Sequence, residues 1–460
     1  MSELISTGLF DRAIRRITAA WREMAAGVSN EEDDSIAGQM RACLAGRGGA
    51  VSARNRAAKL AETYLFLDDA GRVDFLRTLA SFDSDAEAVA AAVQVLQAAS
   101  DEAGRATAQM QLRRALEPPR LRLLTQFTAI PDGVKFLVDL RAFLMGHVKG
   151  DPRLTALEND LRGLLASWFD VGFLELRRIT WDSPAALLEK LVGYEAVHEI
   201  RGWRDLKDRL DSDRRCYAFF HPRMPAEPLI FVEVALVEGL ADSVQRLLDQ
   251  KAPVLDPAGA DTAIFYSISN CQRGLGGISF GNFLIKRVVD ELSAEFRNLK
   301  AFATLSPIPG FRRWLDARVR DAAEGLLTDD ESSALRAVAP DAENGPAALT
   351  AIIAGRGWLR DANLKKTVEP VLVRLCARYL LNEGNARRAA DPVAHFHLSN
   401  GARVERLNPE ADISEKGLKE SAAIMVNYLY DPGRIEQYHE DYAGEGKRNA
   451  SSAVRRLARA

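Results

Sequence analysis

The sequence has 460 residues, of which 47% are hydrophobic and 27% charged, and this is the composition of a globular protein. Such a length exceeds what one ordinary hydrophobic core serves, so we expect two or three domains. The formal net charge is −3, from 61 basic and 64 acidic residues, which argues against a protein that coats a polyanion.

The four cysteines are scattered, without a CxxC pair or a disulfide-like spacing, which predicts a reducing compartment and no structural zinc. The amino terminus lacks the basic-then-apolar pattern of a secretory signal, and no uncharged apolar run approaches the roughly 18 residues of a membrane span. The last residues, Arg459-Ala460, do not form a Ser-Lys-Leu peroxisomal address. We therefore expect a cytoplasmic protein.

The first part of the chain, residues 1–172, is predicted to be helical throughout. Stretches such as 86–99 and 154–168 are rich in Ala, Leu, Glu and Arg, which are good helix formers. The second stretch has an apolar stripe that would pack into the core of its domain, and surplus amphipathic helices often make subunit contacts. The stripe consists of Leu154, Leu157, Leu161, Leu164 and Leu165.

From about residue 173 short apolar runs bounded by Pro, Gly or Asn appear, and these are typical of buried strands. An amphipathic helix is predicted over 283–296, and the mixture indicates an α/β or α+β domain. Residues 321–365 are expected to form a helical insertion, and residues 409–430 a strand exit followed by a helix. The predicted strands are Cys216–Phe220, Leu229–Val237, Ala263–Ser269, Phe302–Leu305 and Val393–Leu398.

A glycine-rich stretch at 272–282 follows a predicted strand and precedes the predicted helix. Such a turn brings backbone N–H groups close to an anion at a helix N-terminus. It is neither a Walker A loop, because Asn282 stands where Lys is needed, nor a dinucleotide loop, because Ser279 replaces its last glycine. Two interpretations stay open: a pyrophosphate cradle with Arg273, Lys286 and Arg287 as nearby cations, or a turn without a ligand.

Ser306 follows the predicted strand 302–305 and precedes Pro307-Ile308-Pro309-Gly310. The prolines fix φ and prevent the ladder from continuing, so Ser306 is expected at a strand end on a stiff backbone. This suits a functional hydroxyl, although no G-x-S-x-G nucleophile elbow is present. The local sequence alone favours a turn-initiating serine.

His395 and His397 lie in the stretch Asp391 to Gly401. If this stretch is a strand, its alternation puts both histidines on one face, and Asn400-Gly401 predicts a hairpin turn after it. The pair is compatible with a catalytic histidine, a polar strand face or the start of a metal site. No third metal ligand follows at a typical spacing.

In this order the stretches resemble the malonyl-CoA decarboxylase family. The matching blocks are residues 263–269, 281–289, 305–311 and 391–401, and the downstream Tyr428 region is also similar. The resemblance covers most of residues 215–430 and is specific there, whereas the helical part resembles the family in layout only.

The resemblance implies an α+β chain with a helical oligomerisation domain at 1–172 and a GNAT-like acyl-CoA-binding catalytic domain at 173–460. It identifies Ser306 and His397 as the catalytic residues. His395 departs from the family, in which Asn often stands there, so it could tune His397 or only pack beside it. The implied malonyl-CoA loop comprises Gly276, Gly277, Ile278, Ser279, Phe280, Gly281 and Asn282.

The activity that the resemblance implies is the conversion of malonyl-CoA to acetyl-CoA and CO₂ by a homodimer or homotetramer, with no nucleic-acid or membrane partner. No metal or organic cofactor is expected, because the thioester itself accepts the electrons released with CO₂. Three alternatives remain: an acetyltransferase on the same fold, a non-catalytic acyl-CoA-sensing protein, and a metal-dependent decarboxylase.

Overall fold

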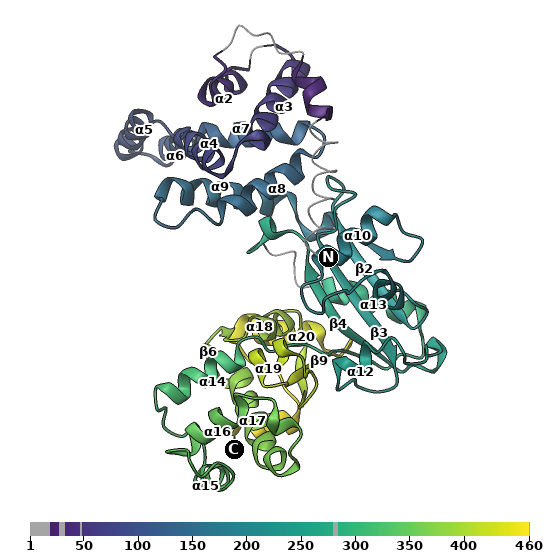
Figure 1. Ribbon diagram of the computed structural model, residues 1–460. Coiled ribbons are helices and arrows are strands. Elements are labelled where there is room, and N and C mark those ends of the chain that lie inside the picture. The colour runs from purple at the N-terminus through teal and green to yellow at the C-terminus, as the bar shows by residue number, and fades with distance from the viewer. Residues whose placement is uncertain (1–18, 27–32, 47, 279–283, 460) are drawn as a thin grey trace. The chain divides into compact units, whose positions relative to one another are not determined.

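The computed structural model describes residues 19–26, 33–46, 48–278 and 284–459. The chain divides into two compact units, which are described separately below (Figure 1). The first comprises Met1–Glu175, Phe220–Leu229 and Cys271–Phe280, and the second comprises the remaining segments. In the described ranges, no helix is both long enough and apolar enough to span a membrane.

The first unit is helical, as predicted. The leucine stripe predicted from the sequence lies on α9. Asp151 caps this helix by accepting hydrogen bonds from the N–H groups of Arg153 and Leu154. All the stripe leucines except Leu164 are buried. The helices are α2 (Ile36–Ala45), α3 (Ala50–Phe66), α4 (Asp69–Ser81), α5 (Ala86–Ala98), α6 (Glu102–Leu116), α7 (Pro119–Gln126), α8 (Gly133–Leu144) and α9 (Pro152–Trp168), with short 3-10 turns η1 (Phe127–Ala129), η2 (Val171–Phe173) and η4 (Arg273–Leu275).

The second part of the chain contains a seven-stranded mixed sheet in the order β1-β2-β3-β4-β5-β9-β8. Strands β4 and β5 run parallel, with helix α13 between them in the chain, and β2–β3, β3–β4, β5–β9 and β8–β9 pair antiparallel. The α+β class is therefore confirmed. The strands are β1 (Glu175–Ile179), β2 (Arg214–Phe220), β3 (Ile230–Val237), β4 (Thr262–Asn270), β5 (Ala301–Thr304), β8 (Arg403–Asn408) and β9 (Met425–Tyr430), with a separate hairpin of β6 (Gly384–Asn385) and β7 (Arg388–Ala389).

The helices of this part include α13, where the sequence predicts a helix at 283–296, and two helices in the predicted insertion, α15 and α16. The expected strand exit followed by a helix at 409–430 is found, because β8 ends at Asn408 and α19 follows it, but the strand β9 at the end of this stretch was not expected. The helices are α10 (Ala185–Tyr194), α11 (Trp203–Asp208), α12 (Val244–Leu247), α13 (Leu284–Glu295), α14 (Phe311–Arg320), α15 (Asp329–Val338), α16 (Gly345–Ile353), α17 (Ala362–Asn382), α18 (Pro392–Ser399), α19 (Glu415–Ser421), α20 (Ile435–Glu445) and α21 (Ser452–Arg459), with η3 (Pro257–Gly259) and η5 (Gly357–Leu359).

Four of the five predicted strands are confirmed as β2, β3, β4 and β5, but the fifth is wrong: Val393–Leu398 lies in α18. Asp391 accepts hydrogen bonds from the N–H groups of Val393 and Ala394, and Pro392 occupies the first helical position. Both are strong helix-start signals that outweigh the β propensity of the apolar run. The predicted Asn400-Gly401 hairpin turn is instead the end of this helix, with Gly401 at φ 81°.

A β-bulge in β4 separates two kinds of environment along that strand. Glu233 and Val234 are consecutive on β3, yet their partners on β4 are Ser267 and Phe265, two residues apart. Consecutive strand residues point to opposite faces, so Ser267 and Phe265 do too. The face of Phe265 continues through its β5 partner Thr304.

Candidate active site

Ser306 lies where the chain leaves β5, and its backbone position is fixed by two strands. The N–H of Leu305 still donates to Phe265 on β4, at 3.0 Å, whereas Ser306 exchanges both of its backbone hydrogen bonds with Val426 on β9, at 2.9 and 3.0 Å. The backbone thus switches its hydrogen-bonding partner from β4 to β9 between Leu305 and Ser306. Ser306 is 5% exposed, so it is a buried hydroxyl on a backbone held by pairing, as the sequence predicts.

His397 reaches Ser306 from α18. Its Nε2 lies 3.1 Å from Ser306 Oγ, its Nδ1 lies 2.8 Å from the Tyr430 hydroxyl, and its ring stacks on Tyr428 with centroids 4.5 Å apart. His397 is 3% exposed. The two residues that the sequence singles out, 91 positions apart, therefore form a hydrogen-bonded dyad.

The hydrogen bonds determine which imidazole nitrogen carries the proton. The hydroxyl of Ser306 donates to Thr304 Oγ1 at 2.8 Å, so its single proton is already used. His397 Nε2 must then be the donor to Ser306 Oγ, and Nδ1 accepts from the Tyr430 hydroxyl. A directed chain runs from Tyr430 through His397 and Ser306 to Thr304.

Burial lowers the pKa of His397 to about 3, so the imidazole is neutral near pH 7. Burial also raises the pKa of Tyr430 well above its ordinary value. The residues hydrogen-bonded to the imidazole are hydroxyls, and neither carries a compensating charge. The dyad is consequently a neutral site whose protonation responds to any charge placed beside it.

His395 does not share a face with His397, and the expectation that it does was wrong. Residues two positions apart in a helix point about 200° away from each other around its axis. His395 therefore points to another side of α18, where its Nδ1 lies 2.8 Å from the Tyr442 hydroxyl. The Tyr442 hydroxyl also accepts from the Ala389 N–H. In the described part of the chain no group of three His, Cys, Asp or Glu side chains gathers as metal ligands would.

Asp391 connects the stretches that contain Ser306 and His397, and no role was predicted for it from the sequence. Its Oδ1 caps α18, and its Oδ2 accepts from the Gly310 N–H at 3.1 Å, four residues after Ser306. Burial raises the pKa of Asp391, while the backbone donors partly oppose that shift. A Cβ on Gly310 would lie 3.3 Å from this carboxylate and 2.1 Å from the Tyr379 hydroxyl, so glycine allows the close approach.

Thr304, Tyr428 and Tyr430 were also missed as members of the site. Thr304 accepts from the N–H of Tyr428 as well as from Ser306, and both tyrosines are fully buried. Their strand spacing was the available signal, because Thr304 with Ser306 and Tyr428 with Tyr430 are alternate residues that face one side. Only the pairing of β5 with β9 shows that these faces coincide.

The predicted malonyl-CoA loop is described only in part. Ser279, Phe280, Gly281 and Asn282 lie outside the described residues, whereas Gly276, Gly277 and Ile278 belong to the first unit. Gly277 has φ 74°, which favours glycine.

The turn that precedes this loop is held by α8 within the first unit. The buried Arg141 donates to the carbonyls of Gly274 and Gly276 at 2.6 and 3.0 Å and pairs with Glu158. A Cβ on Gly274 would come within 1.7 Å of the Val138 carbonyl oxygen. Gly274 therefore serves packing, whatever the rest of the turn binds.

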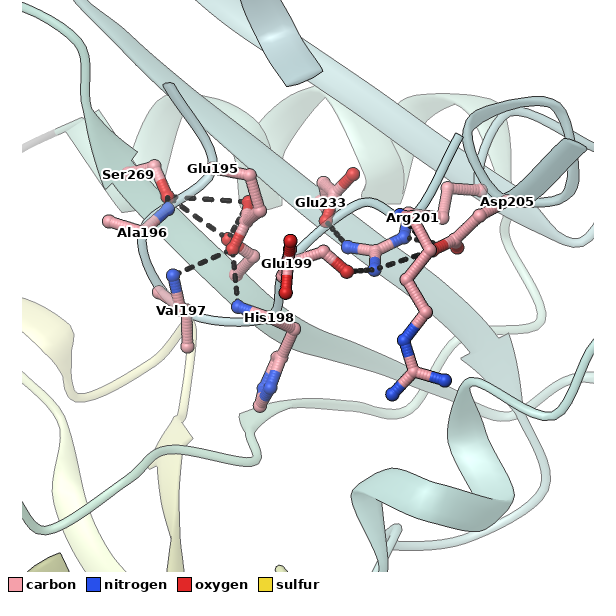
Figure 2. A network of polar contacts seen from close by, with 11 residues as sticks. Glu195, Ala196, Val197, His198, Glu199, Arg201, Asp205, Glu233 and Ser269 are labelled. Carbon is pink, nitrogen blue, oxygen red and sulfur yellow. Dashed lines mark hydrogen bonds and ion pairs between the residues drawn. The ribbon is translucent and has the colours of Figure 1, made fainter. Parts of the chain in front are cut away.

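A second buried polar cluster, the arginine–glutamate cluster, lies on the face of the sheet shared by Glu233 and its β4 partner Ser267. Figure 2 shows Glu195, Asp205 and Glu233 of this cluster. Arg209 donates to Asp205 at 2.9 Å and to Glu233 at 3.1 Å. Beside it, Glu195 accepts from Ser267 at 2.7 Å and from the N–H groups of the next loop. Burial raises the pKa of Glu233, and the Arg209 guanidinium opposes that shift.

Known proteins match the chain over most of its length. Residues 172–460 match the family model of the malonyl-CoA decarboxylase C-terminal domain, and residues 82–169 match that of the N-terminal domain. The Mus musculus protein named "Malonyl-CoA decarboxylase, mitochondrial" is 40% identical over 357 residues, which are 75% of this chain and 72% of that protein. The Anser anser anser protein of the same name is 36% identical over 395 residues, covering 82% and 78%.

Solved structures agree. The malonyl-CoA decarboxylase of Rhodopseudomonas palustris superposes with a TM-score of 0.83 at 39% identity, covering 92% of this chain and 99% of that one. The enzyme from Cupriavidus metallidurans gives a TM-score of 0.71 at 42% identity, covering 92% and 98%. Because both domain models match and these relatives are about 40% identical over most of the chain, the chain belongs to the malonyl-CoA decarboxylase family.

Proposed function

We propose that this protein decarboxylates malonyl-CoA to acetyl-CoA and CO₂, with Ser306 and His397 as the catalytic residues. The observation that carries the proposal is the buried hydrogen bond of 3.1 Å between these two side chains. They come from two of the sequence blocks that resemble the family, and family membership supplies the substrate.

The acyl-CoA thioester is proposed to lie along β4. The ladder between β4 and β5 ends at the pair Phe265–Thr304, while β4 continues to Asn270. Beyond that pair the chain after β5 turns to β9, so residues 266–270 have no β5 partner on that side. An extended chain with amide groups can pair there, as peptides do at strand edges. This would place the thioester near Ser306 in a GNAT-like catalytic domain.

The bond that breaks joins the methylene carbon C2 to the carboxylate carbon. Its electron pair passes to C2 and is delocalised onto the thioester oxygen as an enolate, CO₂ leaves, and C2 then takes one proton. The thioester is the electron acceptor, so we propose a reaction without a metal or organic cofactor. Preorganised donors at the enolate oxygen are typically worth about 3–4 kcal/mol.

We assign proton delivery to Ser306, with His397 as the group that restores its proton. Ser306 Oγ accepts from Nε2, so a proton leaving Ser306 for C2 is replaced along an existing hydrogen bond. The substrate carboxylate, once bound beside the dyad, raises the pKa of His397, because an opposite charge favours the imidazolium. Substrate binding would thus bring in the proton that the reaction consumes.

Malonyl-CoA alone, without any acceptor, is the test of this function. We expect acetyl-CoA and CO₂ in equal amounts, and neither product from an acetyltransferase or from an acyl-CoA sensor. Full activity after exhaustive chelation would exclude a metal-dependent decarboxylase. If malonyl-CoA is bound but recovered intact, the proposed function is wrong.

We further propose that residues 1–172 form the oligomerisation domain of a cytoplasmic homodimer or homotetramer, with residues 173–460 as the catalytic domain. The hairpin of α5 and α6 supports an assembly role. Only Ala92 of α5 and Ala108 of α6 are buried, whereas Val95, Met110 and Leu116 are 49%, 60% and 51% exposed. Such side chains suit a subunit interface, and sedimentation of a Val95→Glu/Met110→Glu variant as a smaller species would support one.

A further inference from the structure

A cationic cavity in the second unit lies apart from the dyad residues. Its volume is about 500 Å³, and it is lined by the last turn of α17, the β6–β7 hairpin, the residues after α20, and α21. Three arginines line it, Arg448, Arg455 and Arg459, and neither Ser306 nor His397 does. Ligand sites for small molecules have volumes of about 300–1,000 Å³.

The charge of this cavity is one-sided. Among the described residues no carboxylate lines it, and none of the three arginines forms an ion pair there. The whole chain has a net charge of −3, so this local excess of positive charge runs against the average. Arg455 and Arg459 are four residues apart on α21, and like charges at that spacing destabilise a helix slightly. An anion in the cavity would relieve this repulsion.

Arg448 is held in place by acceptors that do not neutralise it. Its guanidinium donates to the carbonyls of Leu381 at 2.7 Å and of Asn385 and Arg388 at 3.2 Å. Burial lowers the pKa of Arg448, because its charge is removed from water, and the nearby Tyr442 and Glu383 only partly oppose that shift. An oriented, uncompensated guanidinium is what an anion site requires.

The wall beside Arg448 has a close backbone approach that only glycine permits. Gly446 has φ 66°, and a Cβ there would come within 1.8 Å of the Ala386 carbonyl oxygen. Gly384, in strand β6 of the hairpin, has φ 123°, and a Cβ there would lie 2.2 Å from the carbonyl oxygen of Arg388 in β7. The cavity is thus a fixed feature of the fold and not a gap between loose side chains.

We propose that this cavity binds a small molecule with phosphate groups, such as a nucleoside diphosphate. Arginine matches phosphate oxygens with two parallel donors, and three arginines suit a ligand with at least two negative charges. The volume leaves room for a nucleoside beside the phosphates. The site is separate from the acyl-CoA site, and its ligand is not consumed in the decarboxylation.

The test is a calorimetric titration of the full-length protein with ADP, in the presence of saturating coenzyme A so that the acyl-CoA site is filled. We expect one ADP per chain, displaced by inorganic pyrophosphate. In the Arg455→Gln/Arg459→Gln variant the Kd should rise at least tenfold, about 1.4 kcal/mol. Arg456→Gln is the matched control: this arginine is exposed on the same helix but does not line the cavity, so its Kd should change less than twofold.

Three outcomes would overturn the proposal: no heat of binding with either ADP or pyrophosphate, an equal loss in Arg456→Gln, or a heat of ADP binding that is seen only when coenzyme A is omitted. Circular dichroism and the decarboxylation rate of the double variant should match those of the unmodified protein. This readout separates failure of the cavity proposal from failure of the proposed enzyme function.

Discussion

Two buried polar clusters occupy opposite faces of one sheet, and they differ in whether their side chains carry charge. The dyad cluster places a neutral imidazole among hydroxyls and an aromatic ring, from Ser306, Tyr430 and Tyr428. The arginine–glutamate cluster places a guanidinium between the carboxylates of Asp205 and Glu233. A β-bulge in β4 separates the two, because it turns Phe265 and Ser267 to different faces.

The comparison indicates which cluster can change its protonation during a reaction. In the arginine–glutamate cluster the single guanidinium of Arg209 binds the carboxylates of Asp205 and Glu233, so losing it would leave these buried groups without a counter-ion. In the dyad cluster no fixed charge opposes a change, so an arriving carboxylate sets the protonation of His397. We therefore assign chemistry to the first cluster and stability to the second.

The largest effect is expected from His397→Ala. Removal of the proton-supplying group should lower kcat by about 100- to 10,000-fold, while the dissociation constant of acetyl-CoA stays nearly unchanged. Steady-state assays and calorimetry measure the two quantities. Turnover that survives within about tenfold would show that His397 does not supply the proton.

Arg209→Met tests the other side of the comparison. It leaves Glu233 and Asp205 buried without a counter-ion, so the free energy of unfolding should fall by about 3–5 kcal/mol, as measured by urea denaturation. Arg209→Met/Glu233→Leu is the matched control and should recover part of this loss. If the single variant is as stable as the unmodified protein, the cluster does not have the stabilising role assigned here.

Tyr430→Phe should have an intermediate effect on catalysis. It removes the hydroxyl that donates to Nδ1 and thus holds the proton of the imidazole on Nε2. We expect kcat to fall about 10- to 100-fold at nearly constant KM, because the tautomer affects the proton transfer and not acyl-CoA binding. A raised KM with normal kcat would instead assign the hydroxyl to substrate binding.

The buried imidazole also predicts how stability depends on pH. The pKa of His397 is about 3 in the folded state and about 6.5 in the unfolded chain, so the unfolded state binds more protons between these values. Stability is therefore fully present above pH 6.5 and falls as the pH decreases towards 3. From pH 7.5 to 5.5 this one residue should account for about 1.4 kcal/mol. A His397→Gln variant should lose that part of the pH dependence, and an unchanged slope would contradict the neutral imidazole.

The strands could be predicted from the sequence because their signals are local, whereas Ser306 and His397 were identified through the family resemblance, since the local sequence alone favoured a turn-initiating serine. The apolar runs of β2 to β5 and the Ser-Pro-x-Pro stop after β5 depend on neighbouring residues only. The α18 helix was missed, although its Asp-Pro start is also local, because the alternation of His395 and His397 suggested a strand. Tyr430 and Asp391 could not be found, since their roles depend on the β5–β9 pairing and on the approach of Gly310.

The smallest effect is expected from His395→Asn, which sharpens the distinction between the two histidines of α18. His395 contacts Tyr442, and the helix directs it away from the Ser306 side. An asparagine can keep one hydrogen bond to the Tyr442 hydroxyl, so we expect kcat and KM within about threefold of the unmodified values and a stability change of about 1 kcal/mol or less. Parallel kinetics with His397→Asn supply the comparison. A loss of kcat as large in His395→Asn as in His397→Asn would mean that both residues act on the substrate, and the assignment of proton supply to His397 alone would fail.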